Sequence, residues 1–290
     1  MPELPEVETV RAGLEKYLLG AIVTEIDVLD ERSLKRHLAG SQDFRDKLVG
    51  SRFTSIERRG KFLWIPLDSD SKALVGHLGM SGQMLVRLKD AVQDKLTRVV
   101  ISLTSRDGED LELRFVDQRL FGSLMIDDLE SDNLGGQVPH SASHIALDPL
   151  DERFNSANVI EKMLKRSAGI KKVLLDQQVM SGVGNIYADE TLWRSKLHYD
   201  IPTNQLSIAK LNEVIGHATD ILKSAVQAGG TSFDEQYKNV NGESGYFEVS
   251  LNAYGQAGKP CARCGKPMVR DAWMNRGSHY CPNCQKLPKS

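Results

Sequence analysis

Four cysteines near the carboxyl end of the sequence constrain the fold more than any other feature. They lie at positions 261, 264, 281 and 284, in the pattern C-x2-C-x16-C-x2-C. This spacing is typical of a zinc ribbon, in which four thiolates bind one tetrahedral structural ion and leave no position open for catalysis. Two disulfides or a redox pair are the alternatives. We expect Cys261, Cys264, Cys281 and Cys284 to bind one structural Zn²⁺.

The sequence also bears on the cellular compartment. Its first residues lack the basic region and apolar run of a secretory signal, and no run approaches the roughly 20 apolar residues of a membrane-spanning helix. Intracellular chains use clustered cysteines for metal more often than for disulfides. We therefore expect a cytoplasmic protein without a membrane partner, and nothing in the sequence suggests a stable oligomer, so we expect a monomer.

Charge is unevenly distributed along the chain. A net charge of −2 and a pI near 6.4 argue mildly against a nucleic-acid partner, because such domains usually carry a basic surface. Residues 257–290, however, hold seven basic residues against one acidic residue, so this tail carries +6 and the remainder −8. The basic tail is also the part that contains the cysteines, although ribbons bind proteins as well as nucleic acids.

Apolar periodicity predicts a helix followed by a sheet domain in the first half. Val7, Val10, Leu14 and Leu18 recur at helical spacing, with Pro5 suited to the first turn and Gly20 at the end. Short stretches rich in β-branched, aromatic and leucine residues then continue to about residue 126. No long helix separates them, which indicates antiparallel strands in two packed sheets.

Helical periodicity returns in the second half. One stripe covers residues 159–164, and a longer one covers 208–226 and ends at Gly229-Gly230. The segment before them loses periodicity and is rich in Gly, Asp, Ser, Pro and His, as linkers are. We expect an α+β chain in four parts: a β-sandwich domain at 1–130, a linker at 131–149, a helical domain at 150–256 and the ribbon at 257–290.

The first eight residues, MPELPEVE, permit a chemical hypothesis. Removal of Met1 would leave Pro2 with a free secondary amine, and an α-amino group has a reference pKa of about 8. Attack of this amine on an aldehydic carbon gives a cationic iminium, which acts as an electron sink. Glu3 could serve as general acid or base. The alternative is an ordinary helix start, since acidic residues in a first turn interact favourably with the helix dipole.

Three glycine-containing motifs allow two interpretations each. SGVGNIY resembles a phosphate cradle at a helix start, but a tight turn between packed helices uses glycine in the same way, and the motif lacks the lysine of a P-loop. HLGMSG contains Met80, and DQRLFG contains Arg119 and Phe121. Taken alone, the last two motifs favour the simpler interpretation of a core methionine, a core phenylalanine and a surface arginine.

Together, the motifs of this chain resemble one family, the formamidopyrimidine-DNA glycosylases, which are bacterial 8-oxoguanine repair enzymes. The resemblance rests on seven stretches in the family's order, from Pro2 to Cys284: MPELPEVE, RRGKFLW, GHLGMSG, DQRLFG, GVGNIYADE, GGTSF and RGSHYCPNC. It implies an N-terminal antiparallel β-sandwich flanked by helices, a C-terminal helix–two-turn–helix domain with the zinc ribbon, and damaged double-stranded DNA as partner. The enzyme would then be associated with the bacterial nucleoid through its substrate.

The resemblance implies both glycosylase and lyase chemistry. Pro2 would attack C1′ of the damaged nucleotide, and Glu3 would assist sugar-ring opening and base departure, with Glu6 supporting the site. The iminium would then promote β- and δ-elimination, cutting the strand on both sides. Lys61 and Arg276 match residues held to assist elimination, so we expect both to be catalytic.

The resemblance also implies contacts with DNA. Lys61, His77, Asn185 and Arg276 match phosphate-contacting positions, and Lys171 in GIKKVLLD is a further candidate. Met80, Arg119 and Phe121 match the residues that fill the gap left by a flipped base. In this role Met80 and Phe121 are apolar wedges and Arg119 is a donor to the orphaned cytosine. The stretch GGTSFDEQYKNVNGESGYF matches the loop that closes over the extruded base.

Two other functions compete with this prediction. Sister enzymes that resemble endonuclease VIII remove oxidised pyrimidines with the same terminal Pro-Glu pair. PELPEVE and the complete set of Met80, Arg119 and Phe121 favour oxidised purines instead. The chain could also be a zinc-ribbon binding protein without catalysis. In that interpretation Pro2 and Glu3 serve only to start the first helix.

Overall fold

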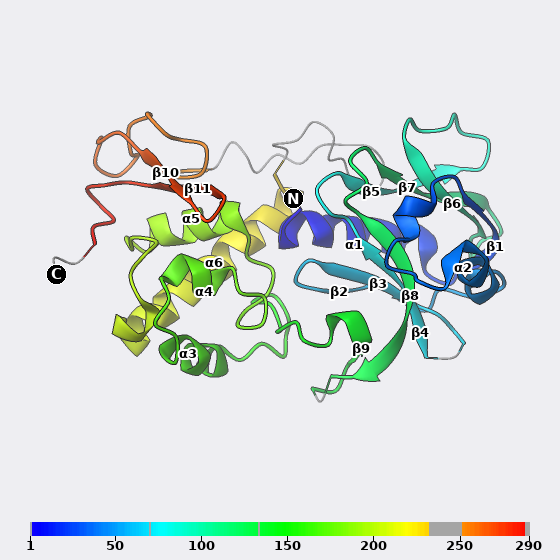
Figure 1. Ribbon diagram of the computed structural model, residues 1–290, viewed down its shortest axis with the longest axis horizontal. Coiled ribbons are helices and arrows are strands. Elements are labelled where there is room, and N and C mark those ends of the chain that lie inside the picture. The colour runs from blue at the N-terminus through cyan, green and yellow to red at the C-terminus, as the bar shows by residue number, and fades with distance from the viewer. Residues whose placement is uncertain (1, 70, 133, 232–250, 288–290) are drawn as a thin grey trace. The chain divides into compact units, whose positions relative to one another are not determined.

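The structure is a computed structural model that describes residues 2–69, 71–132, 134–231 and 251–287. The described residues form two compact units, which are shown in Figure 1. The first unit holds residues 2–144 and 229–231, and the second holds residues 145–228 and 251–287. The predicted linker at 131–149 and the predicted separation of the ribbon at 257–290 stay predictions, as do the other boundaries.

Two antiparallel sheets form the framework of the first unit. One sheet has the order β1-β6-β7-β5, and the other has the order β2-β3-β4-β8-β9. Their strands are β1 (Ile22–Val28), β2 (Glu57–Arg59), β3 (Phe62–Pro66), β4 (Lys72–His77), β5 (Gly82–Leu88), β6 (Thr97–Thr104), β7 (Asp110–Asp117), β8 (Ser123–Ser131) and β9 (Gln137–Pro139). Every paired neighbour runs antiparallel, so the two-sheet prediction for the first half is confirmed.

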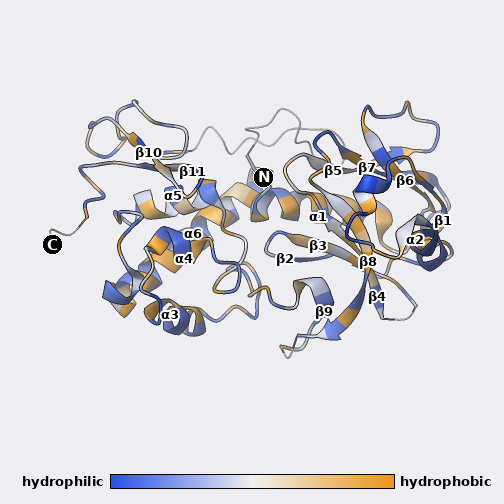
Figure 2. Ribbon diagram, in the orientation of Figure 1, coloured by the Kyte–Doolittle hydropathy of each residue, from blue (hydrophilic) through white to orange (hydrophobic). Residues whose placement is uncertain are grey.

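Helix α1 (Leu4–Leu18) buries one apolar stripe in the core of the first unit. Val7, Val10, Leu14 and Leu18 are at most 1% exposed and join inward-facing residues of the sheets in one cluster. Figure 2 shows hydrophobic and hydrophilic stretches alternating along α1. Each such buried side chain contributes about 1.5–3 kcal/mol of transfer free energy, so the core determines which face of the helix turns inward. Short elements η1 (Glu31–Leu34), α2 (Gly40–Leu48) and η2 (His140–Ala142) complete the unit.

Helices and one hairpin build the second unit. Its elements are α3 (Ser156–Leu164), α4 (Ile170–Leu174), α5 (Asn185–Arg194), η3 (Thr203–Gln205), α6 (Ile208–Gln227), β10 (Val269–Trp273) and β11 (Arg276–Tyr280). Both predicted helical stripes are present in α3 and α6. Ser207 caps α6 by accepting a hydrogen bond from the Lys210 amide. Gly229 follows the helix at φ +76°, a conformation that glycine adopts without strain. Among the residues that the structure describes, none of the helices combines the length and apolar character needed to cross a bilayer.

A buried ion pair fastens the end of β2 to the segment after β8. Arg59 Nη2 bonds the carboxylate of Asp132, and the two side chains are 4% and 2% exposed. The amides of Leu134 and Gly136 each donate to Asp132 Oδ1 at 2.8 Å. Burial alone would raise the pKa of Asp132, but the Gly136 and Leu134 amides and Arg59 lower it to about 2. The ionised carboxylate therefore stabilises the folded state.

Asp132→Asn tests this contribution. The pKa of the carboxyl falls from 3.8 to about 2 on folding, so its contribution is complete above about pH 4 and is lost as the pH falls through about 2. The variant should lose about 2 kcal/mol of unfolding free energy at pH 7, and the difference from wild type should shrink between about pH 4 and about pH 2. Urea denaturation at several pH values measures both. Asp107→Asn, at an exposed turn, is the control, and a pH-independent difference for Asp132→Asn would contradict the prediction.

Candidate functional site

Pro2 and Glu3 lie at the start of α1, where backbone geometry holds them. Both residues are buried, and Glu3 is the N-cap residue with extended backbone angles of φ −103° and ψ −171°. The Glu3 amide donates to Glu6 Oε2 at 2.8 Å, and the Glu3 side chain forms the reciprocal half of a capping box. The carboxyl group next to Pro2 is therefore fixed at the positive end of a helix dipole.

The second oxygen of Glu6 binds a distant part of the first unit. Glu6 Oε1 accepts hydrogen bonds from the Thr231 amide at 2.8 Å and from the Thr231 hydroxyl at 3.0 Å. Gly230, at φ +84°, lies so close that an added Cβ would sit 2.9 Å from this oxygen. One carboxylate thus joins the Glu3 amide to Thr231. The rest of the predicted base-capping loop, residues 232–247, lies outside the described residues.

Lys61 and His77 come from the second sheet of the same unit. Lys61 is half-buried in the turn between β2 and β3, and His77 is the last residue of β4. Burial, together with the positive charges of Arg36 and Lys35, lowers the pKa of His77. Its Nδ1 atom has no hydrogen-bond partner among the described residues. We therefore expect a neutral imidazole near pH 7, which can donate one N–H.

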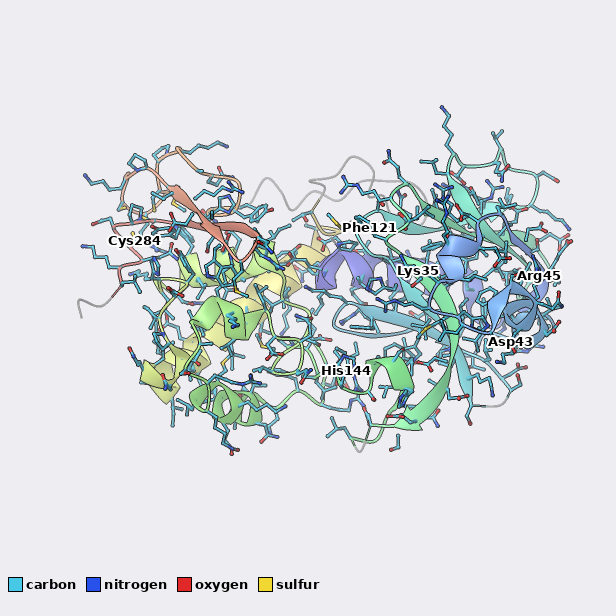
Figure 3. The ribbon with its side chains drawn as sticks, in the orientation of Figure 1. Lys35, Asp43, Arg45, Phe121, His144 and Cys284 are labelled. Carbon is cyan, nitrogen blue, oxygen red and sulfur yellow. The ribbon has the colours of Figure 1, made fainter. Side chains whose placement is uncertain are left out.

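Met80 and Phe121 are surface residues. Phe121 is 53% exposed (Figure 3), Met80 is 40% exposed, and Arg119 is also exposed. The interpretation of Met80 and Phe121 as core residues is therefore wrong. Met80 lies between β4 and β5, and Arg119 and Phe121 lie between β7 and β8. The fold brings these two loops into contact.

Asn185 and the Arg276 region come together within the second unit. Asn185 is the first residue of α5, and its Nδ2 atom donates to the Gly277 carbonyl at 3.1 Å. Arg276 is exposed at the start of β11. The side chain of Asn185 thus holds the backbone directly after Arg276, a relation that the spacing in the sequence did not indicate.

Lys171 is buried, with its ammonium group turned into the second unit. The residue is 0% exposed, and Nζ lies 2.6 Å from Asp189 Oδ1. It also donates to the Gly277 carbonyl at 3.1 Å and to Ser278 Oγ at 3.0 Å. The predicted DNA contact of Lys171 stays a prediction, while the structure shows a bond to the same carbonyl that Asn185 binds.

Sequence reasoning missed two acidic residues of α5 that organise this unit. Asp189 accepts from the His279 amide at 2.9 Å and approaches His279 Nδ1 at 3.0 Å. Glu190 accepts from the amides of residues 252–254 at 2.7 to 3.1 Å. Burial raises the pKa of Glu190, although the three amides act in the opposite direction. Both acids lie within GVGNIYADE, but their partners are too distant in sequence for the motif to reveal them.

The four cysteines converge as their spacing predicted. Their Sγ atoms all lie within 4.8 Å of one another, and Cys264 and Cys281 are 3.4 Å apart. A tetrahedral ion with metal–sulfur bonds of about 2.3 Å requires sulfur separations of about 3.8 Å, so the cluster could hold one metal ion. The Lys266 amide and the Asn283 side chain lower the pKa of Cys264 to about 6, whereas burial raises that of Cys281 to about 12.

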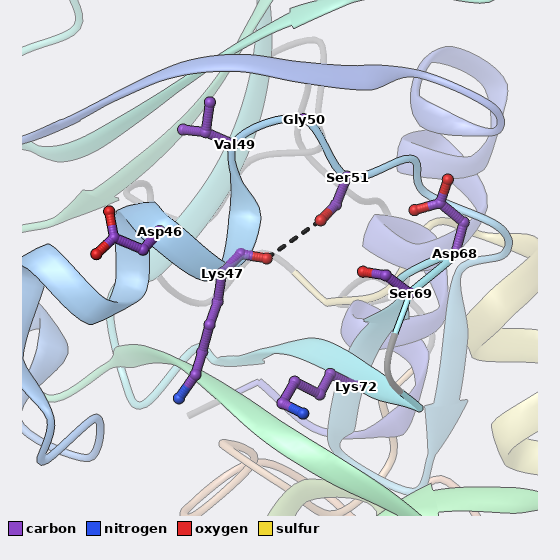
Figure 4. A pocket seen from close by; sticks show the side chains of 8 residues that line it. All are labelled: Asp46, Lys47, Val49, Gly50, Ser51, Asp68, Ser69 and Lys72. Atoms are coloured by element: carbon purple, nitrogen blue, oxygen red, sulfur yellow. Dashed lines mark hydrogen bonds between the residues drawn. The ribbon is translucent and has the colours of Figure 1, made fainter.

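A pocket on the first unit does not extend the candidate site. Its lining comprises Asp46, Lys47, Val49, Gly50, Ser51, Asp68, Ser69 and Lys72, which Figure 4 shows with the Ser51 hydroxyl bonded to the Lys47 carbonyl. Lys47 pairs with Asp43 at 2.7 Å, and Lys72 pairs with Asp128 at 3.4 Å. An anionic ligand would have to compete with these carboxylates.

The sequence matches two domain models in the order of the two units. Residues 1–124 match the formamidopyrimidine-DNA glycosylase N-terminal domain, and residues 145–236 match the formamidopyrimidine-DNA glycosylase H2TH domain. The chain belongs to the formamidopyrimidine-DNA glycosylase family. Membership makes the chain an enzyme of the DNA glycosylase class, which confirms the family resemblance and the predicted fold class.

Full-length relatives of the formamidopyrimidine-DNA glycosylase family agree with this assignment. The formamidopyrimidine-DNA glycosylase of a Nocardioides species is 49% identical over 290 residues, covering 100% of this chain and 96% of that protein. The Lactococcus lactis Fpg in complex with abasic-site DNA matches with a TM-score of 0.83 at 31% identity, over 99% of this chain and 100% of that one. A mutant of that protein in complex with Fapy-dG containing DNA has a TM-score of 0.84 at the same identity and coverage.

Asp189→Asn tests the buried network of the second unit. Removing one charge of a buried pair leaves the other uncompensated, which costs about 3–5 kcal/mol. Urea denaturation should therefore show a loss of this order. The control is Asp220→Asn, because Asp220 is 59% exposed and lies 3.6 Å from Arg194, so its loss should cost less than about 1 kcal/mol. Equal losses in the two variants would contradict the importance of the buried pair.

Proposed function

We propose that the chain is a bifunctional DNA repair glycosylase that excises oxidised purines, 8-oxoguanine and formamidopyrimidines, from duplex DNA. In this proposal Pro2 forms a Schiff base with the sugar, and β,δ-elimination then cleaves the abasic strand. The observation that carries the proposal is the start of α1, where Pro2 and Glu3 are buried and Glu6 binds the Glu3 amide. Family membership and the DNA-bound Lactococcus lactis protein support the substrate class.

Pro2 supplies the nucleophile. Its nitrogen attacks C1′, the bond between C1′ and the base breaks, and the base leaves with a proton. The nitrogen then loses its proton, the C1′–O4′ bond breaks as O4′ takes up a proton, and nitrogen and C1′ form an iminium, which carries no proton on nitrogen and withdraws electrons from the sugar. Loss of a proton from C2′ expels the 3′ phosphate in β-elimination, and a second elimination expels the 5′ phosphate. One nitrogen thus serves both base excision and strand cleavage.

Glu3 is suited to proton transfer in these steps. Its carboxyl group is adjacent to Pro2 and is held by the helix start, where a carboxylate gains about 0.3–1 kcal/mol from the dipole. In the proposal Glu3 takes the proton that the Pro2 nitrogen loses and gives it to O4′ of the opening sugar ring, and it also assists base departure. Glu6 supports the site by holding the Glu3 amide, since its two oxygens are already engaged by Glu3 and Thr231.

Phosphate contacts are assigned to Lys61, His77, Asn185 and Arg276. Lysine and arginine contribute charge, while Asn185 and a neutral His77 contribute N–H donors. Lys61 and Arg276 would also assist elimination. The burial of Lys171 supports an indirect part in DNA binding, in which its ammonium group holds the Gly277 carbonyl beside Arg276. Met80, Arg119 and Phe121 would fill the gap left by the flipped base, and their exposure at the surface is consistent with that role.

The ribbon is proposed to bind one structural Zn²⁺ through Cys261, Cys264, Cys281 and Cys284. The convergence of four sulfur atoms supports this ion, because thiolates in this arrangement favour zinc. The ion would stabilise the small hairpin β10–β11, which presents Arg276. Cys261 and Cys281 also belong to a small apolar cluster with Ala253 and Met268.

Borohydride trapping on an 8-oxoguanine:cytosine duplex tests the chemistry at Pro2. Reduction should fix a covalent adduct on Pro2 of the processed protein, located by mass analysis of the amino-terminal peptide. Pro2→Gly should reduce trapping, and retention of Met1 should almost abolish it, because the Pro2 nitrogen is then part of an amide. The control is Glu8→Gln, which changes a carboxylate on the same helix that pairs with Arg58. Absence of an adduct with processed wild-type protein would refute the proposal.

Metal analysis and chelation test the role of the ribbon. The purified protein should contain one zinc ion per chain, and Cys264→Ser should lower this content. Removal of zinc should weaken duplex binding measured at fixed ionic strength, and added Zn²⁺ should restore it. Zinc-free protein that binds duplex DNA as tightly as the loaded protein would show that the ribbon does not contribute to binding.

A further inference from the structure

Two loops of the first unit touch through their backbones. The 78–81 loop joins β4 to β5, and the 118–122 loop joins β7 to β8. Gly79, at φ +60°, lies against the second loop, where an added Cβ would be 2.6 Å from the Gly122 nitrogen and from the Phe121 carbonyl carbon. A Cβ on Gly122 would likewise be 2.7 Å from the His77 carbonyl oxygen. Glycine on both sides therefore permits a contact that no larger residue allows.

The buried carboxylate of Asp117 binds both loops. Asp117 is 0% exposed, and its Oδ1 accepts from the Ser81 hydroxyl at 2.6 Å and from the Arg119 amide at 3.2 Å. Its Oδ2 accepts from the Gly122 amide at 2.8 Å. The Ser81 hydroxyl oxygen also accepts from the Arg119 amide at 3.1 Å, which closes a small network across the two loops.

The sheet holds Asp117 itself in place. The Asp117 amide donates to the Leu96 carbonyl at 3.2 Å, and the Asp117 carbonyl accepts from Arg98 Nε at 2.8 Å. The carboxylate is therefore attached to the end of β7, and the loops are attached to the carboxylate. A charged acceptor makes stronger hydrogen bonds than a neutral one, so this arrangement is stiff.

A lysine supports the second loop from its outer side. Leu120 has φ +55°, an uncommon conformation for a residue with a branched side chain. Lys35 Nζ donates to the Leu120 carbonyl at 2.6 Å. Lys35 is exposed and lies directly after η1, so this bond can be removed without opening the core (Figure 3).

We propose that Asp117 is a positioning residue that holds Met80, Arg119 and Phe121 in one preformed arrangement. Met80 belongs to the first of the two loops that Asp117 joins, and Arg119 and Phe121 belong to the second. The inference rests on the proposed function, in which these three residues fill the gap that a flipped base leaves in the duplex. Two loops held in a preformed arrangement lose less conformational entropy on entering a duplex than two independent loops would. Asp117 acts through the loops and touches neither the sugar nor the base.

The first test needs no DNA. Asp117→Asn keeps the shape of the side chain but replaces one oxygen with an NH₂ group, which cannot accept from the loop donors. The measured quantity is hydrogen exchange of the Gly82 amide. Gly82 lies opposite Asp117 in the β5–β7 ladder, but its amide donates to the Leu78 carbonyl at 2.8 Å, which closes the 78–81 loop, and not to the Asp117 carboxylate. Loss of a charge-assisted bond should speed this exchange by at least about tenfold if Asp117 holds the two loops together. Unchanged Gly82 exchange would overturn the proposal.

The second test measures excision in matched duplexes. In one duplex 8-oxoguanine is paired with cytosine, and in the other the lesion lies unpaired in a bulge and leaves no partner base to replace. The ratio of kcat/KM for the paired lesion to that for the bulged lesion should fall about tenfold in Asp117→Asn. A purely destabilising substitution would lower both rates together and leave the ratio unchanged. An unchanged ratio, with faster Gly82 exchange, would overturn the part assigned to Asp117 in lesion recognition.

Additional variants make the result independent of any folding defect. Ser81→Ala removes one donor of the network, and Lys35→Met removes the bond to Leu120, so both should change the ratio in the same direction by a smaller factor. The control is Asp128→Asn on β8, where the carboxylate is 79% exposed and pairs with Lys72; it should leave Gly82 exchange and the ratio unchanged. Wild-type protein that excises neither lesion would refute the proposed function, and Gly82 exchange would still decide whether Asp117 couples the loops.

Discussion

The carboxylate of Glu6 lies between two backbone amides that belong to opposite ends of the first unit's sequence. It accepts from Glu3 at 2.8 Å and from Thr231, 225 residues away, also at 2.8 Å. A buried carboxylate must be compensated by donors, and these two amides are donors that the helix start and the chain at Thr231 would otherwise leave unpaired. The position of Glu3, and with it the proposed chemistry at Pro2, depends on this arrangement.

The same physical device recurs at three other buried acids. Asp117, Asp189 and Glu190 are at most 5% exposed, and each accepts hydrogen bonds from backbone amides. The amides belong to loops in the case of Asp117 and Glu190, and to strand β11 in the case of Asp189. Burial disfavours the charged form of a carboxyl group, whereas amide donors favour it. These acids therefore fix loops that apolar packing alone would leave underdetermined. Three of the four acids, Glu6, Asp117 and Asp189, bind segments that carry or adjoin residues proposed to meet DNA.

Several parts of the fold and the site followed from local patterns. The stripe of Val7, Val10 and Leu14 predicted α1 because a helix repeats every 3.6 residues, and the core confirms it. The cysteine spacing predicted the cluster because two short turns can place four sulfur atoms around one point. The partner of Lys171 could not be predicted, because an ion pair between α4 and α5 depends on how these helices pack.

Sequence by itself determined the family, the strand-rich and helical halves, the sulfur cluster and the identity of the chemical groups at the chain's start, because each is written in local periodicity, spacing or motif order. Only the tertiary structure decided that Met80 and Phe121 are exposed, that His77 loses its charge more readily than usual, and that Lys171 turns inward. It also decided that Asp117 joins two loops. The physical reason is that the burial of a group and the charges around it depend on residues that are distant in sequence. Folding brings those residues within a few ångströms of the group.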